Sequence, residues 1–175
     1  MQIGKQAPDF RGMAVLPDKE FGEIGLSDYK GKWVVLFFYP LDFTFVCPTE
    51  IRGFNEACAK FKSAGAEVIG CSIDSHFSHL NWIERDFKKL DFPLLSDITK
   101  EIAQSYGVLL DEGFALRGTF IIDPAGVLKS VVMNDTEIGR SIDETLRTLA
   151  ALQTGKSTGC GWKPGDPTVK VPALT

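Results

Sequence analysis

The sequence lacks several features that would place it directly in a common functional class. It has two histidines among 175 residues, and no two of its four cysteines are separated by two residues. Neither a zinc knuckle nor the Cys-x-x-Cys motif of dithiol oxidoreductases is therefore present. The net charge is only −4 at pH 7, so nothing in the electrostatics favours nucleic acid or an anionic membrane as a partner.

Long apolar runs are also missing. The longest, Trp33 to Tyr39, is too short to span a bilayer, and the first ten residues lack the apolar stretch of a secretory signal. We therefore expect a cytoplasmic protein with no membrane partner. The length and the 44% hydrophobic composition favour one domain with a substantial core.

The apolar residues that are present predict strands that alternate with helices. Residues 32–40 and 67–74 form continuous apolar runs, as in strands buried on both faces. Between them lies a pattern with helical spacing, and Gly65 is its expected end. The residues of this helical face are Ile51, Phe54, Cys58 and Phe61.

The second half of the chain continues this alternation. A capping box from Ser141 to Glu144 opens the last predicted helix, which stops at Gly155. Residues 1–30 and the last twenty residues, rich in Gly and Pro, are predicted to be irregular. The other predicted elements are helices at 78–90 and 99–107, an extended piece at 92–97 and a hairpin whose turn is 124–126.

This element order is that of an α/β, thioredoxin-like fold, with a central mixed sheet flanked by helices, an N-terminal extension and a C-terminal tail. We expect the main domain to span 1–155 and the tail 156–175. Ligands bind at the carboxyl ends of the parallel strands in such sheets. Cys47 follows the first strand and lies at the start of the first long helix, so it is expected at that edge.

Two interpretations of Cys47 compete. It could be a small buried hydrophobe, or a nucleophile whose thiolate is favoured by the N-terminus of the helix. Glu50 opposes thiolate formation unless a cation neutralises it, and Arg52 and Arg117 are the candidates. The position at a helix terminus favours the nucleophile, whereas Cys58 and Cys71 fall at core positions and are interpreted as inert.

The two histidines, His76 and His79, have a spacing that could hold two metal ligands on a helix. No third ligand stands near them in the sequence, and His76 is predicted to precede the helix. Polar packing or a subunit contact is therefore favoured over a metal site. Trp82 and Trp162 are interpreted as packing residues.

The stretch from Pro40 to Cys47, "PLDFTFVC", fits the Pro-x-x-x-Thr-x-x-Cys signature of peroxiredoxins, and "FVCPTE" resembles the typical two-cysteine subfamily, which includes the alkyl hydroperoxide reductase C component. The resemblance continues over nearly the whole chain, through "VIGCSIDSHFSHLNW", "FPLLSD", "YGVLLDEGFALRGTFIIDPAG" and "GWKPGD".

The resemblance implies a role for each matching residue. Cys47 would be the peroxidatic cysteine, oxidised to a sulfenic acid, and Thr44 would hold the peroxide. Arg117 would stabilise the thiolate and the transition state, Glu50 would hold that arginine, and Pro40 would shield the pocket. Fixed donors suit the negative charge that develops on the leaving oxygen.

The resemblance also implies that Cys160 of a partner subunit resolves Cys47 to an intersubunit disulfide. Glu50 occupies the position where thioredoxins carry their second cysteine, which argues against a dithiol oxidoreductase. The tail departs from the family: relatives show Val-Cys-Pro-Ala-x-Trp, whereas this chain has "TGCGW" around Cys160. A one-cysteine peroxidase and a redox-sensing or chaperone-like oligomer remain the alternatives.

Two motifs of oxidation-sensitive relatives, Gly-Gly-Leu-Gly and a C-terminal Tyr-Phe, are absent, so we expect Cys47 to resist sulfinic oxidation. The expected substrates are hydrogen peroxide and alkyl hydroperoxides. The expected electron donor is thioredoxin or a disulfide reductase. The resemblance further implies homodimers that can assemble into decamers, and no metal, haem or flavin cofactor.

Overall fold

The computed structural model describes residues 1–170 and divides into two compact units, Met1–Arg140 and a second that begins at Ser141. The first unit holds the sheet and three α-helices, and the described part of the second, residues 141–170, holds one helix and the segment with Cys160. The functional boundary expected between 155 and 156 stays a prediction, and the last five residues of that tail lie outside the described residues.

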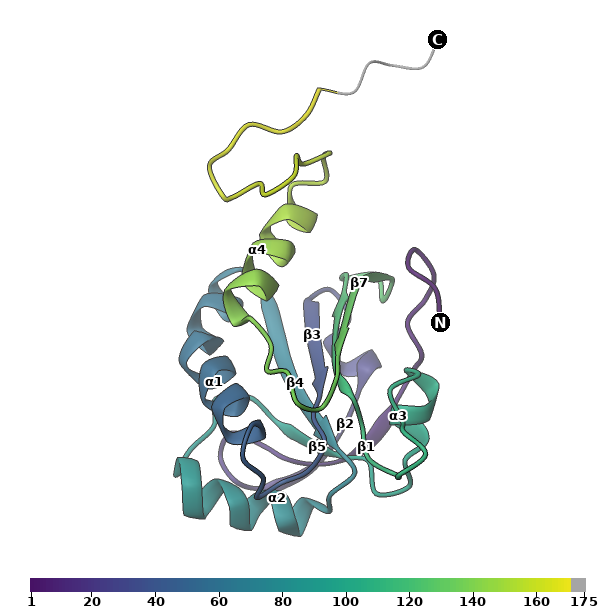
Figure 1. The fold of residues 1–175 in the computed structure, drawn as a ribbon, viewed down its shortest axis with the longest axis vertical. Helices are drawn as coiled ribbons and strands as arrows, with labels where there is room; N and C mark the ends of the chain where they lie inside the picture. The colour runs from purple at the N-terminus through teal and green to yellow at the C-terminus, as the bar shows by residue number, and fades with distance from the viewer. Residues whose placement is uncertain (171–175) are drawn as a thin grey trace. The chain divides into compact units, whose positions relative to one another are not determined.

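A seven-stranded mixed sheet forms the centre of the first unit (Figure 1), in the order β2-β1-β5-β4-β3-β6-β7. As predicted, β3 and β4 are parallel, and β6 and β7 form an antiparallel hairpin whose turn contains Gly126 at φ +82°. The strands are β1 (Arg11–Val15), β2 (Phe21–Gly25), β3 (Trp33–Phe38), β4 (Ala66–Ser72), β5 (Leu94–Ser96), β6 (Arg117–Ile122) and β7 (Leu128–Asn134).

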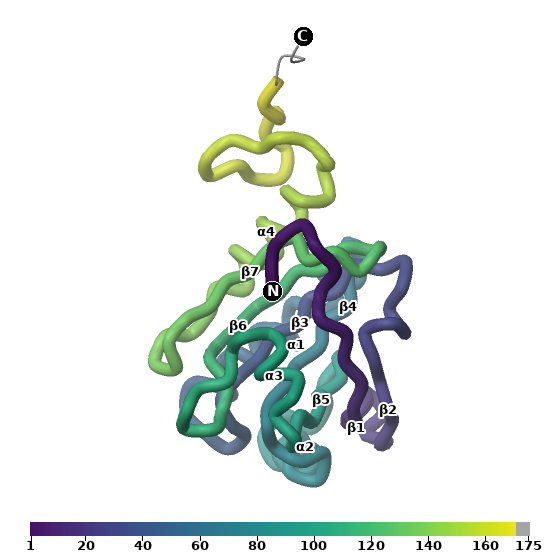
Figure 2. The backbone as a smooth tube through the Cα atoms, turned by 90° about the vertical axis from the view of Figure 1, so that its right-hand side faces the viewer, coloured from purple at the N-terminus to yellow at the C-terminus, as the bar shows by residue number. Residues whose placement is uncertain are grey.

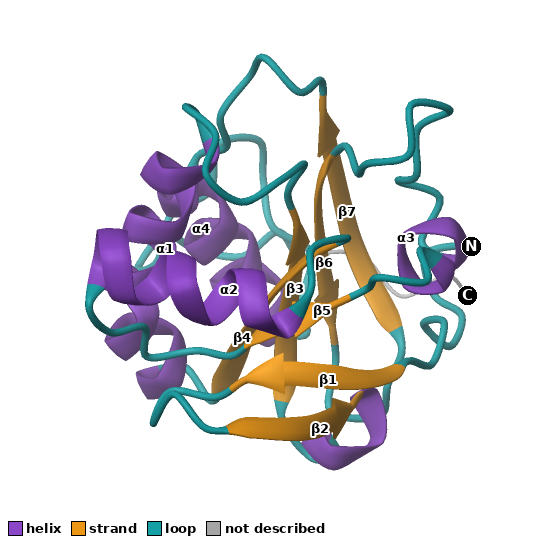
Figure 3. Cartoon of the chain, turned by 90° about the horizontal axis from the view of Figure 1, so that it is seen from below, coloured by secondary structure: helices purple, strands orange, loops and turns teal. Residues whose placement is uncertain are grey.

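Helices cover both faces of this sheet. Figures 1 and 3 show α1 (Cys47–Ser63) and α2 (His76–Trp82) on one face and α3 (Glu101–Ser105) on the other. A short 3₁₀ helix at Leu26–Tyr29 precedes β3. The predicted α/β architecture, with its flanking helices, is therefore confirmed.

The run of apolar residues in β3 is explained by burial on both faces. Phe37 stacks on Phe54 of α1 with ring centroids 4.0 Å apart. Phe38 points the opposite way and meets Tyr106, which follows α3, at 5.4 Å. Because alternate side chains of a strand face opposite sides, β3 is held between two cores.

The prediction for the first thirty residues was wrong. Residues 11–15 and 21–25 form an antiparallel pair at one edge of the sheet, visible beyond β5 in Figure 2. These strands are rich in glycine, and only their last two residues are buried, so they give no alternation of apolar and polar residues.

The helix predicted at 78–90 is also placed differently. It begins at His76, which therefore belongs to the helix, and the Ser75 hydroxyl caps it by accepting from the Ser78 N–H at 3.2 Å. The regular part ends at Trp82 and continues as a wider π-type turn, Ile83–Phe87, that stops where Lys88 adopts φ +66°.

The second unit contains α4 (Ile142–Gln153) and the segment after it. The Ser141 hydroxyl accepts from the Glu144 N–H at 3.2 Å, so the predicted start of this helix is confirmed. Within this unit the Trp162 indole is 7% exposed and donates to the Asp166 carbonyl, while Arg147 donates to the Trp162 carbonyl. Trp162 is thus a packing residue, as predicted.

Candidate active site

Cys47 is the first residue of α1, as predicted from its place after the apolar run. Val46 is the N-cap residue and Pro48 lies in the first turn, where its missing N–H costs no hydrogen bond. The thiol is fully buried. Its position combines the N-terminal end of a 17-residue helix with the carboxyl end of β3, where the sheet leaves room for a ligand.

Arg117 and Glu50 converge on this thiol. Arg117, the first residue of β6, places Nη1 3.4 Å from Cys47 Sγ and 2.7 Å from Glu50 Oε2. Its Nε donates to the Thr136 carbonyl at 2.8 Å, which fixes the guanidinium plane. Since both Arg117 and Glu50 are almost entirely buried, the cation meets the sulfur in surroundings with little solvent screening.

A second arginine, Arg140, completes the network and was not found from the sequence. Its Nε and Nη2 donate to the two carboxylate oxygens of Glu50 at 2.8 and 2.6 Å, and its backbone N–H adds a third bond at 2.9 Å. Nη1 donates to the carbonyl of Phe38, the last residue of β3, and to that of Gly118, the second residue of β6. Arg140 therefore ties Glu50 to both strands.

The charge on Glu50 follows from these partners. Burial alone would raise the pKa of its carboxyl, but the hydrogen bonds and charge of Arg140, with the charge of Arg117, hold that pKa below its ordinary value of 4.5. Glu50 is thus an anion between two cations, and its negative charge is directed at the arginines. This removes the objection that Glu50 would disfavour a thiolate at Cys47.

We expect Glu50→Gln to reduce the free energy of unfolding by about 3 kcal/mol at pH 7, because a buried ion pair loses one partner. A carboxyl whose pKa is lowered by folding stabilises the fold fully above its unfolded pKa, and this contribution disappears as pH falls through the folded value. The difference between wild type and variant should therefore shrink below about pH 4.5.

Urea unfolding at one protein concentration across pH 3 to 8 measures this difference. The matched control is Glu56→Gln, which removes an exposed carboxylate from the same helix. Equal stability of the two variants at pH 7 would contradict a structural role for the buried network.

An open cavity of 310 Å³ adjoins this network and brings together three of the predicted residues, Pro40, Thr44 and Arg117. Thr44 donates its hydroxyl proton to the Leu41 carbonyl at 3.0 Å, so the lone pairs of its oxygen remain available as acceptors. Arg117 thus lines the cavity and contacts the sulfur of Cys47. The other residues that line the cavity are Leu41, Phe45, Val46, Phe114, Thr136 and Glu137.

The remaining cysteines differ from Cys47 in their surroundings. Burial raises the pKa of Cys58, which donates to the Asp91 carbonyl, and raises that of Cys71 well above its ordinary value. Both thiols are therefore disfavoured as anions, as the prediction of inert core positions requires. Cys160 is exposed.

Two other expectations are settled by position. Arg52, one candidate partner for Glu50, donates instead to the Asp86 carbonyl at 3.3 Å. His79 is fully buried, with Nδ1 2.9 Å from Asp42 Oδ2, so its polar packing is confirmed.

Among residues 1–170, no group of three His, Cys, Asp or Glu side chains could hold a metal ion. No helix in this part of the chain is long and apolar enough to cross a membrane.

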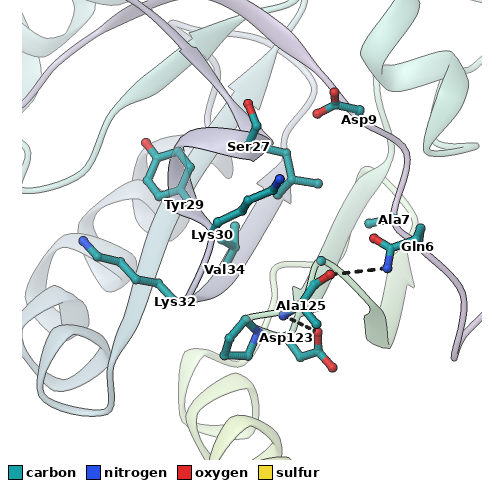
Figure 4. Close-up of a pocket in the computed structure, with 13 residues that line it drawn as sticks. Gln6, Ala7, Asp9, Ser27, Tyr29, Lys30, Lys32, Val34, Asp123 and Ala125 are labelled. Carbon is teal, nitrogen blue, oxygen red and sulfur yellow. Dashed lines mark hydrogen bonds between the residues drawn. The ribbon is translucent and has the colours of Figure 1, made fainter.

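A second cavity of 310 Å³ lies at the opposite end of β3 (Figure 4). Its wall includes Lys30, Lys32 and Tyr29, and across it the Gln6 amide donates to the Ala125 carbonyl at 3.3 Å. Neither Arg117 nor any other residue that contacts Cys47 through the arginine network lines this cavity, so it does not share the chemistry of the site at Cys47.

Comparisons with known proteins agree on one family. Residues 3–131 match the model of the AhpC/TSA family. The chain is 54% identical to peroxiredoxin-2 of Rattus norvegicus over 178 residues, covering 96% of this chain and 89% of the relative. It is 52% identical to peroxiredoxin-1 of Gallus gallus, with coverage of 96% and 89%.

Solved structures give the same result. The reduced 2-Cys peroxiredoxin of Plasmodium vivax superposes with a TM-score of 0.92 at 41% identity, covering 95% of this chain and 92% of that one. AhpC of Mycobacterium tuberculosis gives a TM-score of 0.84 at 40% identity, with coverage of 93% and 99%. The thioredoxin-like fold expected from the element order is therefore confirmed.

Proposed function

Because the chain belongs to the AhpC/TSA family and is a peroxiredoxin, a thiol-dependent peroxidase, we propose that Cys47 is the residue that attacks the peroxide. The observation that carries this proposal is the contact of Arg117 Nη1 with Cys47 Sγ at 3.4 Å, within a buried network held by Glu50. Loss of peroxide consumption in Cys47→Ser, with wild-type consumption intact, is the direct test.

The proposed step is a two-electron oxidation of sulfur. The Cys47 thiolate attacks one peroxide oxygen, a sulfur–oxygen bond forms, and the oxygen–oxygen bond breaks. The leaving oxygen departs as water from hydrogen peroxide, or as an alcohol from an alkyl hydroperoxide, after taking up a proton. Cys47 becomes a sulfenic acid.

The residues around the thiol have distinct proposed roles. Arg117 stabilises the thiolate and the charge on the breaking peroxide bond, because its donors are fixed before the reaction. Thr44 binds the peroxide in the cavity that it shares with Arg117, and Pro40 shields that cavity. Glu50 positions Arg117, and Arg140 in turn positions Glu50.

We further propose that Cys160 of a partner subunit resolves the sulfenic acid. Its thiolate attacks Cys47 Sγ, the disulfide forms, and the sulfenic oxygen leaves as water. Because Cys47 is fully buried, the first turn of α1 must open before the two sulfurs can meet. The exposure of Cys160 supports this role, since it leaves the attacking thiol accessible.

We expect Cys160→Ser to prevent the covalent dimer that wild type forms after one equivalent of hydrogen peroxide, because no second thiol reaches Cys47. Non-reducing gel electrophoresis measures the dimer, and Cys58→Ala is the control that should keep it. A disulfide-linked dimer in Cys160→Ser would contradict the resolving role and favour another cysteine. A fully active Cys160→Ser enzyme without dimers would favour the one-cysteine peroxidase.

The rest of the proposal follows the family. Hydrogen peroxide and alkyl hydroperoxides are the proposed substrates, and thioredoxin or a disulfide reductase the electron donor. The proposed assembly is a homodimer that can form decamers, in the cytoplasm. A redox-sensing or chaperone-like oligomer is the second candidate; slow turnover with every dithiol donor, despite rapid oxidation of Cys47, would favour it.

A further inference from the structure

The cavity beside Arg117 is larger than the peroxide group alone requires. Its volume is 310 Å³, whereas a molecule of water occupies about 30 Å³ of the liquid, so two peroxide oxygens need roughly 60 Å³. The cavity is therefore large enough for the organic part of a hydroperoxide. The side chains that line it can then discriminate between substrates that differ in this organic part.

One part of the wall is apolar and aromatic. Leu41, Phe45 and Val46 come from the loop before α1, and Phe114 comes from the loop before β6. Phe45 is 95% exposed, while Phe114 is half-buried and held by the bond from the Leu110 N–H to its carbonyl at 2.9 Å. An alkyl or aryl group that enters the cavity beside Phe114 removes apolar surface from water, which favours binding.

The two charged residues in the wall of the cavity differ in their exposure to solvent. Arg117 and Glu137 are the two charged residues that line the cavity. Arg117 is buried and already bound to Glu50 and the Thr136 carbonyl, whereas Glu137 is exposed. The free surface of the cavity is therefore dominated by a carboxylate rather than by a cation.

Other exposed acidic residues, close in the chain to those that line the cavity, add to the negative charge. Asp135 lies two residues before Glu137, and Asp111 and Glu112 lie in the loop of Phe114, all exposed. Two cations lie near these loops: Lys100 at Gly113, where a Cβ would lie 2.6 Å from its Nζ, and Arg85, whose guanidinium lies over the ring of Phe43, next to Thr44, and is paired with Asp86. The exposed acids in and beside the lining segments therefore outnumber the cations there, since Arg85 is already paired with Asp86.

We propose that this cavity selects uncharged organic hydroperoxides over those that carry a carboxylate, with Phe114 contacting the organic group and Glu137 repelling the anion. The inference rests on the proposed function of the Cys47 site and names a substrate class for it. The chemical step is unchanged: the selected hydroperoxide oxidises Cys47 and leaves as the alcohol.

The test compares cumene hydroperoxide derivatives that differ only in a para carboxylate or a para carboxamide. These are nearly equal in size, and the carboxyl is ionised at pH 7. We expect kcat/KM for the carboxamide to exceed that for the carboxylate about fivefold at low salt, the factor for one pair of charges a few ångströms apart in water. The ratio should approach one in 1 M salt, where the Debye length is about 3 Å.

Three variants identify the residues responsible. Glu137→Gln should lower the ratio of carboxamide to carboxylate toward one, because it removes the carboxylate that lines the cavity, while Glu20→Gln, which removes an exposed acid at the opposite edge of the sheet, should leave the ratio unchanged. Phe114→Ala should lower kcat/KM for the carboxamide about tenfold relative to hydrogen peroxide, and Phe114→Leu should recover most of this loss.

The outcomes separate this inference from the proposed function. A ratio near one in wild type, or an unchanged ratio in Glu137→Gln, overturns the charge selection while peroxide turnover stands. Equal losses for hydrogen peroxide and the carboxamide in both Phe114 variants overturn the role of the aromatic wall. No turnover of any peroxide by the wild-type chain with a dithiol donor refutes the proposed function itself.

Discussion

Replacement of Cys47 by serine is expected to lower peroxide consumption by at least about 10³-fold, because the nucleophile itself is removed. A serine hydroxyl at this position stays protonated near neutral pH and cannot use the stabilisation that Arg117 gives to a thiolate. The side chain is nearly isosteric and fully buried, so the loss cannot be attributed to an altered surface. Consumption of hydrogen peroxide with an excess of a dithiol donor measures the effect.

The matched control is Cys58→Ala, in the same helix. Burial raises the pKa of Cys58, so that thiol is a poor nucleophile and its removal should change turnover little. Mass spectrometry of the wild type after one equivalent of peroxide should find the first oxidation on the peptide that contains Cys47. Wild-type turnover by Cys47→Ser would refute the assignment and require another cysteine as the nucleophile.

The start of α1 could be predicted because its signals are local. The apolar run of β3, Pro48 one residue after Cys47 and the helical spacing from Ile51 to Phe61 all lie within thirty residues. Local signals of this kind determine where a strand stops and a helix begins. The place of Cys47 at the helix terminus followed from them without any knowledge of the family.

The arginine network could not be predicted in the same way. Arg117 is 67 positions from Glu50, and Arg140 is 90 positions away, so no spacing rule connects them. Arg117 was one of two candidate cations, and only the resemblance to peroxiredoxins favoured it over Arg52. Arg140 directly precedes α4, and nothing next to it in the sequence indicates burial. Its side chain is buried because it binds backbone carbonyls of β3 and β6, and these two strands are neighbours only in the folded sheet.

The two N-terminal strands were missed for a related reason. β2 is the edge strand and pairs with β1, which in turn pairs with β5, and the first three residues of each of these two strands are not buried. An edge strand with glycine at several positions has few apolar residues with period two. Its stability comes from partners distant in the chain, and the sequence of the strand alone does not reveal them.

Replacement of Arg117 by lysine tests whether the geometry of the guanidinium matters beyond its charge. Arg117 uses Nε for the Thr136 carbonyl and Nη1 for both Glu50 and Cys47. An ammonium group has a single nitrogen and cannot reproduce this planar arrangement. We expect kcat/KM for hydrogen peroxide to fall about 10²- to 10³-fold, the usual cost of losing one fixed donor to a developing negative charge.

The control is Arg52→Lys, since Arg52 lies on the exposed side of α1 and donates to the Asp86 carbonyl instead of the network. The thermal midpoint of each variant separates a loss of stability from a loss of rate. A folded Arg117→Lys protein that retains wild-type kcat/KM would show that charge alone suffices. The Glu50 and Arg140 contacts would then serve stability rather than the orientation of Arg117, because an enzyme that tolerates a flexible ammonium has no need of a fixed plane.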